Sequence, residues 1–106
     1  MMLQMKFEIA KYTADTFLPY VGHVLTFEPG SVQLELLQVS RRNVGQVPAG
    51  FREPFALLFA LRSGEPLGRG LYRIVHDDFE ASEWLLTRVM APGQDPRLAY
   101  YEAVFG

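Results

Sequence analysis

The feature that most constrains the fold is an uninterrupted apolar run over residues 55–61, bounded by Pro54 and by Ser63-Gly64. Such a run is too short for a typical buried helix, but it suits a β-strand that is covered on both faces. A turn rich in Gly and Pro follows, and then a second strand-like run over residues 70–76. These two runs predict a central β-hairpin on which the other elements pack.

The composition allows one packed core and excludes several classes of protein. The chain has 106 residues, 49% of them hydrophobic, which predicts a single domain over residues 1–106. Ten Lys and Arg stand against twelve Asp and Glu, and nucleic-acid binding normally needs a basic excess. No apolar run approaches the ~20 residues of a membrane helix. We therefore expect neither nucleic acid nor membrane as a partner.

The expected compartment follows from the N-terminal residues and from the absence of Cys. The start of the chain lacks the basic segment and apolar block of a signal peptide. Without Cys there is no disulfide framework and no thiolate chemistry. We expect a cytoplasmic protein, and export as part of a larger assembly stays open.

Alternating apolar and polar residues predict further strands on both sides of the hairpin. They cover residues 5–9, 23–28, 32–39, 79–90 and 98–105. Six to seven short strands separated by turn signals predict an all-β, mainly antiparallel fold, either a small barrel or a sandwich.

Two of these strands carry detailed expectations. In residues 32–39 the apolar positions change parity near Leu36-Leu37, which predicts a β-bulge or a crossing between two layers. In residues 79–90, Trp84, Leu86 and Met90 share one side of the strand.

One short N-terminal helix is expected within residues 13–22. Thr13 or Thr16 suits its N-cap. Phe17 and Val21 are four residues apart and would face the core. The helix would then plug one end of the sheet.

No set of residues forms a recognisable catalytic or metal-binding motif. His76 precedes Asp77-Asp78, but a zinc or iron site needs two or three His or Cys at defined spacing. No Ser lies in the Gly-x-Ser-x-Gly motif of hydrolases. A triad assembled in space from His23 or His76 stays open. We expect a protein that is not an enzyme and that holds no cofactor or metal.

Arginines provide the candidate binding residues. Arg41, Arg42 and Arg52 flank a long polar loop over residues 40–52, and loops of this length are often functional. Together they would form a surface for an acidic partner. The alternative is scattered ion pairing with nearby acids such as Glu53.

Three segments carry a family resemblance. They are Arg-Glu-Pro-Phe-Ala-Leu-Leu-Phe at 52–59, Gly-Leu-Tyr-Arg-Ile-Val-His at 70–76 and Tyr-Glu-Ala-Val-Phe at 101–105. In this order they resemble an uncharacterised bacterial family, domain of unknown function 6916. The chain departs from the family pattern after His76, where Asp77-Asp78 stands in place of a Pro and a Leu-Gly.

The resemblance implies no established activity, but it suggests an accessory part of a phage-tail-like assembly. Four positions that match the family suit a structural polar network between the hairpin and the last strand: Tyr72, His76, Tyr101 and Glu102.

The leading hypothesis is a non-enzymatic module that binds another protein or a second copy of itself. A small-ligand-binding β-barrel is the first alternative, and it requires a pocket with polar groups inside the barrel. A hydrolase is the second alternative, and it requires His23 or His76 beside Ser or Asp in a cleft.

Overall fold

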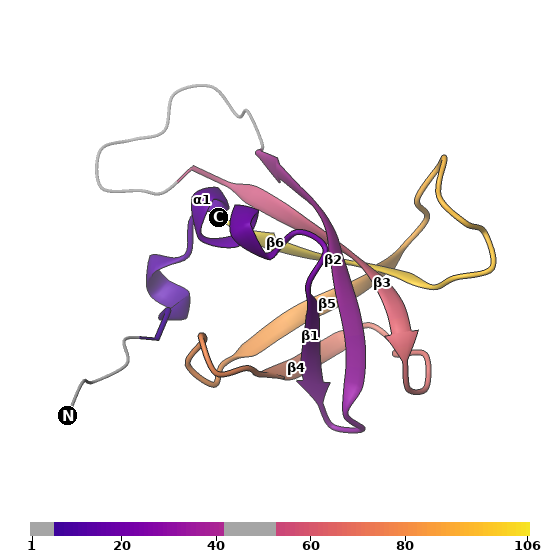
Figure 1. Cartoon of the computed structure of the whole chain (residues 1–106), viewed down its shortest axis with the longest axis horizontal. Coiled ribbons are helices and arrows are strands. Elements are labelled where there is room, and N and C mark those ends of the chain that lie inside the picture. Colours follow the sequence, from indigo (N-terminus) through magenta and orange to yellow (C-terminus); the bar gives the residue numbers. More distant parts are fainter. Residues whose placement is uncertain (1–5, 42–52) are drawn as a thin grey trace.

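Six antiparallel strands close into a barrel in the computed structural model, which describes residues 6–41 and 53–106 (Figure 1). The strands are β1 (Val24–Glu28), β2 (Val32–Arg41), β3 (Phe55–Ser63), β4 (Gly70–Val75), β5 (Glu83–Val89) and β6 (Tyr100–Phe105). Their order around the ring is β1-β2-β3-β6-β5-β4, and β4 pairs with β1 to close it. The all-β prediction is confirmed, and the architecture is the barrel.

The predicted central hairpin is wrong, because β3 and β4 are not neighbours. β3 pairs with β2 and β6, whereas β4 pairs with β1 and β5. Two strands therefore separate β3 from β4 in either direction around the ring. A two-residue turn would force adjacent pairing, but the connection over residues 64–69 can span up to roughly 20 Å. It leads from one side of the barrel to the opposite side.

The hydroxyl of Tyr101, on β6, fixes this connection. It accepts a hydrogen bond from the Leu67 N–H at 2.7 Å and donates one to the Leu67 carbonyl at 3.1 Å. Leu67 also packs against the core. The connection therefore covers one end of the barrel.

The other end is covered by an N-terminal plug, which consists of η1 (Ile9–Lys11), α1 (Ala14–Phe17) and η2 (Leu18–Tyr20). The C-terminus of β6 lies at this end, and the β5–β6 loop lies at the opposite end (Figure 1). Antiparallel strands make this arrangement, because alternate connections fall at opposite ends. The predicted plug is confirmed.

The start of α1 is also confirmed, since Thr13 is its N-cap and forms a capping box with Thr16. Phe17 is fully buried, as expected. Val21 is 42% exposed, so its predicted place in the core is wrong. The chain passes from α1 into the tighter 3₁₀ turn of η2, which breaks the i, i+4 spacing on which that prediction relied.

The prediction of a strand over residues 5–9 is wrong for residues 6–9, which the structure describes. Phe7 forms an isolated bridge with Phe79, and its backbone exchanges hydrogen bonds with Asp78 and Glu80, both at 2.9 Å. The next residues, from Ile9, turn into η1. Because the six strands close on themselves, they leave no free edge for a further strand to join.

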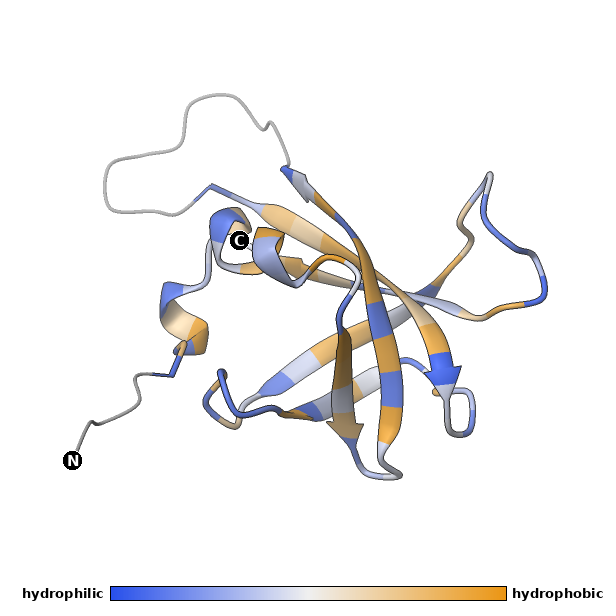
Figure 2. Ribbon diagram, in the orientation of Figure 1, coloured by the Kyte–Doolittle hydropathy of each residue, from blue (hydrophilic) through white to orange (hydrophobic). Residues whose placement is uncertain are grey.

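The predicted bulge is confirmed on β2, where hydrophobic and hydrophilic residues alternate along the strand (Figure 2). Leu36 pairs with Phe59 and Gln38 pairs with Leu58, so the register shifts by one residue between these pairs. The shift lets Leu36 and Val39, which have opposite parity, both pack against the core.

Aromatic rings fill the interior around Trp84, which is 1% exposed. Its ring lies 5.3 to 6.4 Å, between centroids, from those of Tyr12, Phe17, Phe27, Phe59 and Phe105. Two of these rings come from the plug and three from strands, so the plug and the barrel share one core.

Candidate functional site

Of the three arginines expected to bind a partner, the structure describes Arg41; Arg42 and Arg52 lie outside the described residues. Arg41 ends β2, and its guanidinium lies 2.5 Å from the Asp15 carboxylate and 3.9 Å from that of Glu53. These ion pairs connect the plug to the residues that precede β3. A role for the three arginines in partner binding stays a prediction.

The four residues expected to form a polar network lie in two regions. Tyr72 and Tyr101 both reach the 64–69 connection, since the Tyr72 hydroxyl donates to the Gly68 carbonyl at 2.8 Å. His76 lies beyond the other end of β4, where its Nδ1 accepts a hydrogen bond from the Asp78 N–H at 3.0 Å. Glu102 lies on β6, where it pairs in register with Leu58 and Thr87. The structure thus brings the two tyrosines to one loop and places His76 elsewhere.

A cluster that the sequence did not reveal gathers both imidazoles around Tyr20. The rings of His23 and His76 lie 5.7 and 5.8 Å from the Tyr20 ring. The Tyr20 hydroxyl donates to the Asp78 carboxylate at 2.7 Å. The neighbour of the imidazoles is therefore a phenol that already donates to a carboxylate. The cluster joins the plug to the turn between β4 and β5.

Tyr20 should titrate well above an ordinary tyrosine. Burial raises its pKa from 10.0 to about 12, and the hydrogen bond and negative charge of Asp78 act in the same direction. The folded state favours the neutral phenol, so its contribution to stability is complete below pH 10 and is lost as the pH rises towards 12. Burial also raises the pKa of Tyr12, so absorbance at ~295 nm, where phenolates absorb, should show late-titrating phenols of which one is missing from Tyr20→Phe. A difference curve centred near pH 10 would contradict this.

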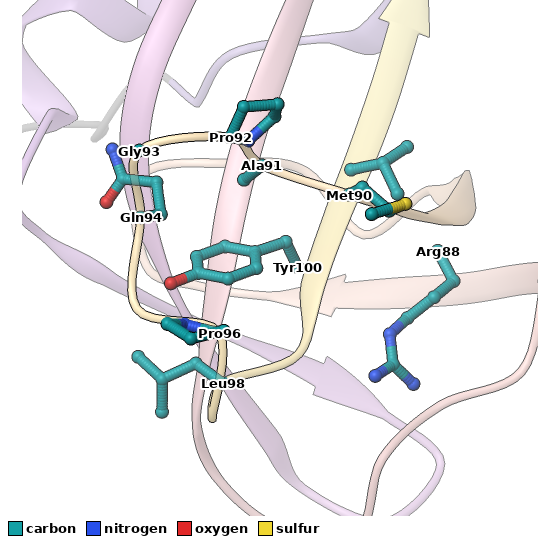
Figure 3. A pocket seen from close by; sticks show the side chains of 10 residues that line it. Arg88, Met90, Ala91, Pro92, Gly93, Gln94, Pro96, Leu98 and Tyr100 are labelled. Atoms are coloured by element: carbon teal, nitrogen blue, oxygen red, sulfur yellow. The ribbon is translucent and has the colours of Figure 1, made fainter.

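A hollow of about 630 Å³ opens within the β5–β6 loop. Its lining is mainly apolar and includes Val89, Met90, Pro92, Pro96, Leu98 and Tyr100. The Tyr100 ring lies inside the curve of the loop, between Ala91-Pro92 and Pro96 (Figure 3). We refer to this site, lined by residues 88–94, 96, 98 and 100, as the hairpin hollow.

Hydrogen bonds within the loop hold the hairpin hollow in shape. The Tyr100 hydroxyl donates to the Asp95 carbonyl at 2.7 Å, and Tyr100 is only 4% exposed. The Gln94 N–H donates to the Ala91 carbonyl at 3.0 Å. The Asp95 carboxylate accepts two hydrogen bonds from the Arg97 side chain, at 3.0 and 3.1 Å. Tyr100 thus forms a fixed floor rather than a mobile rim.

Met90 forms the rim of the hairpin hollow and is 92% exposed. The prediction that Met90 shares one side of a strand with Trp84 and Leu86 is wrong, because β5 ends at Val89 and Met90 leaves the sheet. Met90, Pro92 and Gln94 also line a second hollow of about 380 Å³, which Leu58 and Glu102 line from the sheet. The sequence feature that could have indicated the hairpin hollow is a loop in which a Met, two Pro and a Leu stand among polar residues.

Other kinds of site find no support in the part of the chain that the structure describes. Over residues 6–41 and 53–106, no three His, Cys, Asp or Glu side chains are grouped as a metal site requires. Within the same residues, no helix has the length and apolar character needed to cross a bilayer.

Comparison with known protein families gives a match. The model of the family described as Domain of unknown function (DUF6916) matches residues 12–105. This stretch begins at Tyr12 in the plug and ends with β6, so it includes the six strands and the hairpin hollow. Neither the curated proteins nor the solved structures contain a match.

Proposed function

The chain belongs to the family described as Domain of unknown function (DUF6916), and we propose that it is a non-enzymatic module that binds another protein through the hairpin hollow. The family description names no activity, so the support for this proposal comes from the surface. One observation carries it: an open, apolar hollow whose rim is the exposed side chain of Met90.

The size and lining of the hollow suit the side chains of a partner. Its volume of about 630 Å³ falls within the ~300–1,000 Å³ of typical ligand sites. Met is flexible and polarizable, which lets one side chain adapt to the shape of a partner. An exposed apolar side chain beside an apolar hollow favours an interaction surface over a merely solvated loop.

The alternative of a ligand inside the barrel has less support. Aromatic rings around Trp84 occupy the interior, whereas a closed barrel holds a ligand only where side chains leave room. The plug and the 64–69 connection cover the two ends. We therefore place the binding site on the outside.

The identity and location of the partner are narrower proposals. The family resemblance suggests a component of a phage-tail-like assembly in a bacterium, and we propose such a component as the partner. We also propose that the chain acts in the cytoplasm, where an assembly of this kind would form.

Met90→Asp should remove partner binding. A carboxylate placed in an apolar contact costs more than the ~1.4 kcal/mol that changes affinity tenfold. The immobilised full chain would be used to capture proteins from its source cells, with Leu71→Asp as the control, because Leu71 is 61% exposed on β4 and does not line the hollow. We expect a protein that wild type and Leu71→Asp retain and that Met90→Asp loses. Equal retention by both variants would remove the hollow from the proposal.

A further inference from the structure

We propose that the partner segment in the hairpin hollow is an acidic peptide, with an apolar side chain in the hollow and a neighbouring carboxylate bound by Arg88. This inference rests on the proposed function, and it adds the chemistry of the bound segment. It is argued from the position of Arg88 and from the charges around it.

Arg88 lies near the end of β5, directly opposite Tyr101 of β6 in the strand register. Its guanidinium is 5.9 Å from the centroid of the Tyr101 ring, at the range of a cation–π contact. That ring is fully buried, and its hydroxyl holds Leu67. The cation is therefore positioned by a rigid neighbour before any ligand binds, which lowers the entropic cost of binding.

Within residues 6–41 and 53–106, Arg88 lacks the acidic partner that Arg41, Arg62 and Arg97 have. Arg62 pairs with Glu35 at 2.7 Å, and Arg97 pairs with Asp95 at 3.0 Å. Among the described residues, no carboxylate forms an ion pair with Arg88. Among the described residues that line the hairpin hollow, Arg88 is the charged one. Its guanidinium is directed away from the curve of the loop that surrounds the Tyr100 ring (Figure 3).

Two other described arginines, Arg69 and Arg73, also form no ion pair with a described residue. Neither of them lines the hairpin hollow. Arg73 is opposite Glu28 on one side and Glu83 on the other in the strand register, so acidic neighbours already surround it. Among the described arginines, Arg88 is thus the one that lines the hairpin hollow and forms no ion pair with a described carboxylate.

The chemistry of guanidinium and the position of Met90 define the ligand. A planar guanidinium binds a carboxylate through two parallel hydrogen bonds. Met90, on the rim, lies two residues beyond Arg88 and just past the end of β5. The bound segment would place its apolar side chain beside Met90 and reach past the end of β5 to place its acidic group beside Arg88.

Short labelled peptides test this with the full chain. The probes are fluorescein-labelled Gly-Ser-Leu-Leu-Asp-Asp-Gly and the same peptide with Asn-Asn or Lys-Lys in place of Asp-Asp, followed by fluorescence anisotropy. We expect the Asp peptide to bind at least about tenfold more tightly than the Asn peptide. The preference should shrink as salt is raised, because the carboxylate is partly exposed to solvent.

Variants assign this preference to Arg88. Arg88→Gln should bind the Asp and Asn peptides equally, and Arg88→Lys should retain part of the preference, because it keeps the charge but loses the planar fork. Arg73→Gln is the matched control and should leave the preference unchanged. Circular dichroism confirms the fold of each variant.

The outcomes separate this inference from the proposed function. Equal binding of the Asp and Asn peptides to the wild type, or a preference that survives Arg88→Gln, would overturn the acidic ligand and leave the hollow as a binding site. Peptide binding that is unaffected by Met90→Asp would instead contradict the proposed function. No binding of any probe at about 1 mM would overturn the inference, even if Met90→Asp still abolished protein capture.

Discussion

Trp84→Ala should destabilise the fold by about 3–5 kcal/mol, the usual cost of truncating a fully buried Trp. Trp84 is 1% exposed and meets rings from both the plug and the strands. Its removal leaves a cavity that the surrounding rigid rings cannot fill without leaving their own contacts. Since typical domains are stable by 5–15 kcal/mol, the variant would lie close to unfolding.

Urea unfolding followed by far-UV circular dichroism measures this loss. Trp84 is the sole Trp of the chain, so fluorescence cannot report on the variant. Leu71→Ala is the control, because Leu71 is 61% exposed and its truncation should change stability by no more than about 0.5 kcal/mol. A loss below about 1 kcal/mol for Trp84→Ala would mean that the interior is not one packed cluster.

Phe17→Ala should cost almost as much, about 3–5 kcal/mol, although Phe17 belongs to a helix of only four residues. Helices this short have no stability of their own in water. Phe17 is held by ring contacts with Tyr12, Phe55, Phe79, Trp84 and Phe105, at centroid distances of 5.0 to 6.3 Å. The plug is therefore part of the core, and its loss should weaken the whole barrel.

Two probes together test whether the plug and the barrel unfold as one unit. Trp84 fluorescence reports on the plug end, and far-UV circular dichroism reports on the strands. In both wild type and Phe17→Ala the two signals should change at the same urea concentration. Leu18→Ala is the matched control, because Leu18 adjoins Phe17 but is 49% exposed. A fluorescence change that precedes the loss of strand signal would show that the plug detaches by itself.

Local patterns predicted those parts of the fold that depend on alternation along one strand. β1 lies within the strand predicted over residues 23–28, and its buried residues Leu25 and Phe27 follow a period of two. The bulge on β2 could be predicted for the same reason, since Leu36 and Leu37 break that period. These features need no knowledge of which strands are neighbours.

Pairing between strands could not be predicted in this way. The β3–β4 connection contains the Gly and Pro of a turn, but it is also long enough to cross the end of the barrel. Closure of the barrel decides that it crosses, because β3 and β4 are not neighbours in the ring. The same closure leaves no edge for a strand around Phe7. Both errors came from treating neighbours in sequence as neighbours in the sheet.

The candidate site was the least predictable part. Arg41 attracted attention as a charge beside a long loop, but its carboxylate partner Asp15 is far away in sequence and is brought near by the plug. The hairpin hollow depends on the path of residues 90–99, which the Tyr100 hydroxyl bond to the Asp95 carbonyl helps to set. The sequence shows that Met90 and the two prolines belong to this loop, but it does not show that they line the same hollow.

The antiparallel arrangement places the plug and the C-terminus at one end of the barrel and the hairpin hollow at the other (Figure 1). If the chain were attached to a surface through the plug or through the C-terminus, the hairpin hollow would lie at the end of the barrel farthest from that attachment. In an array of many copies, every hollow would then point outward, and the barrels would act as spacers. Surface immobilisation through the C-terminus should therefore leave the hairpin hollow accessible, whereas coupling through the β5–β6 loop would block it.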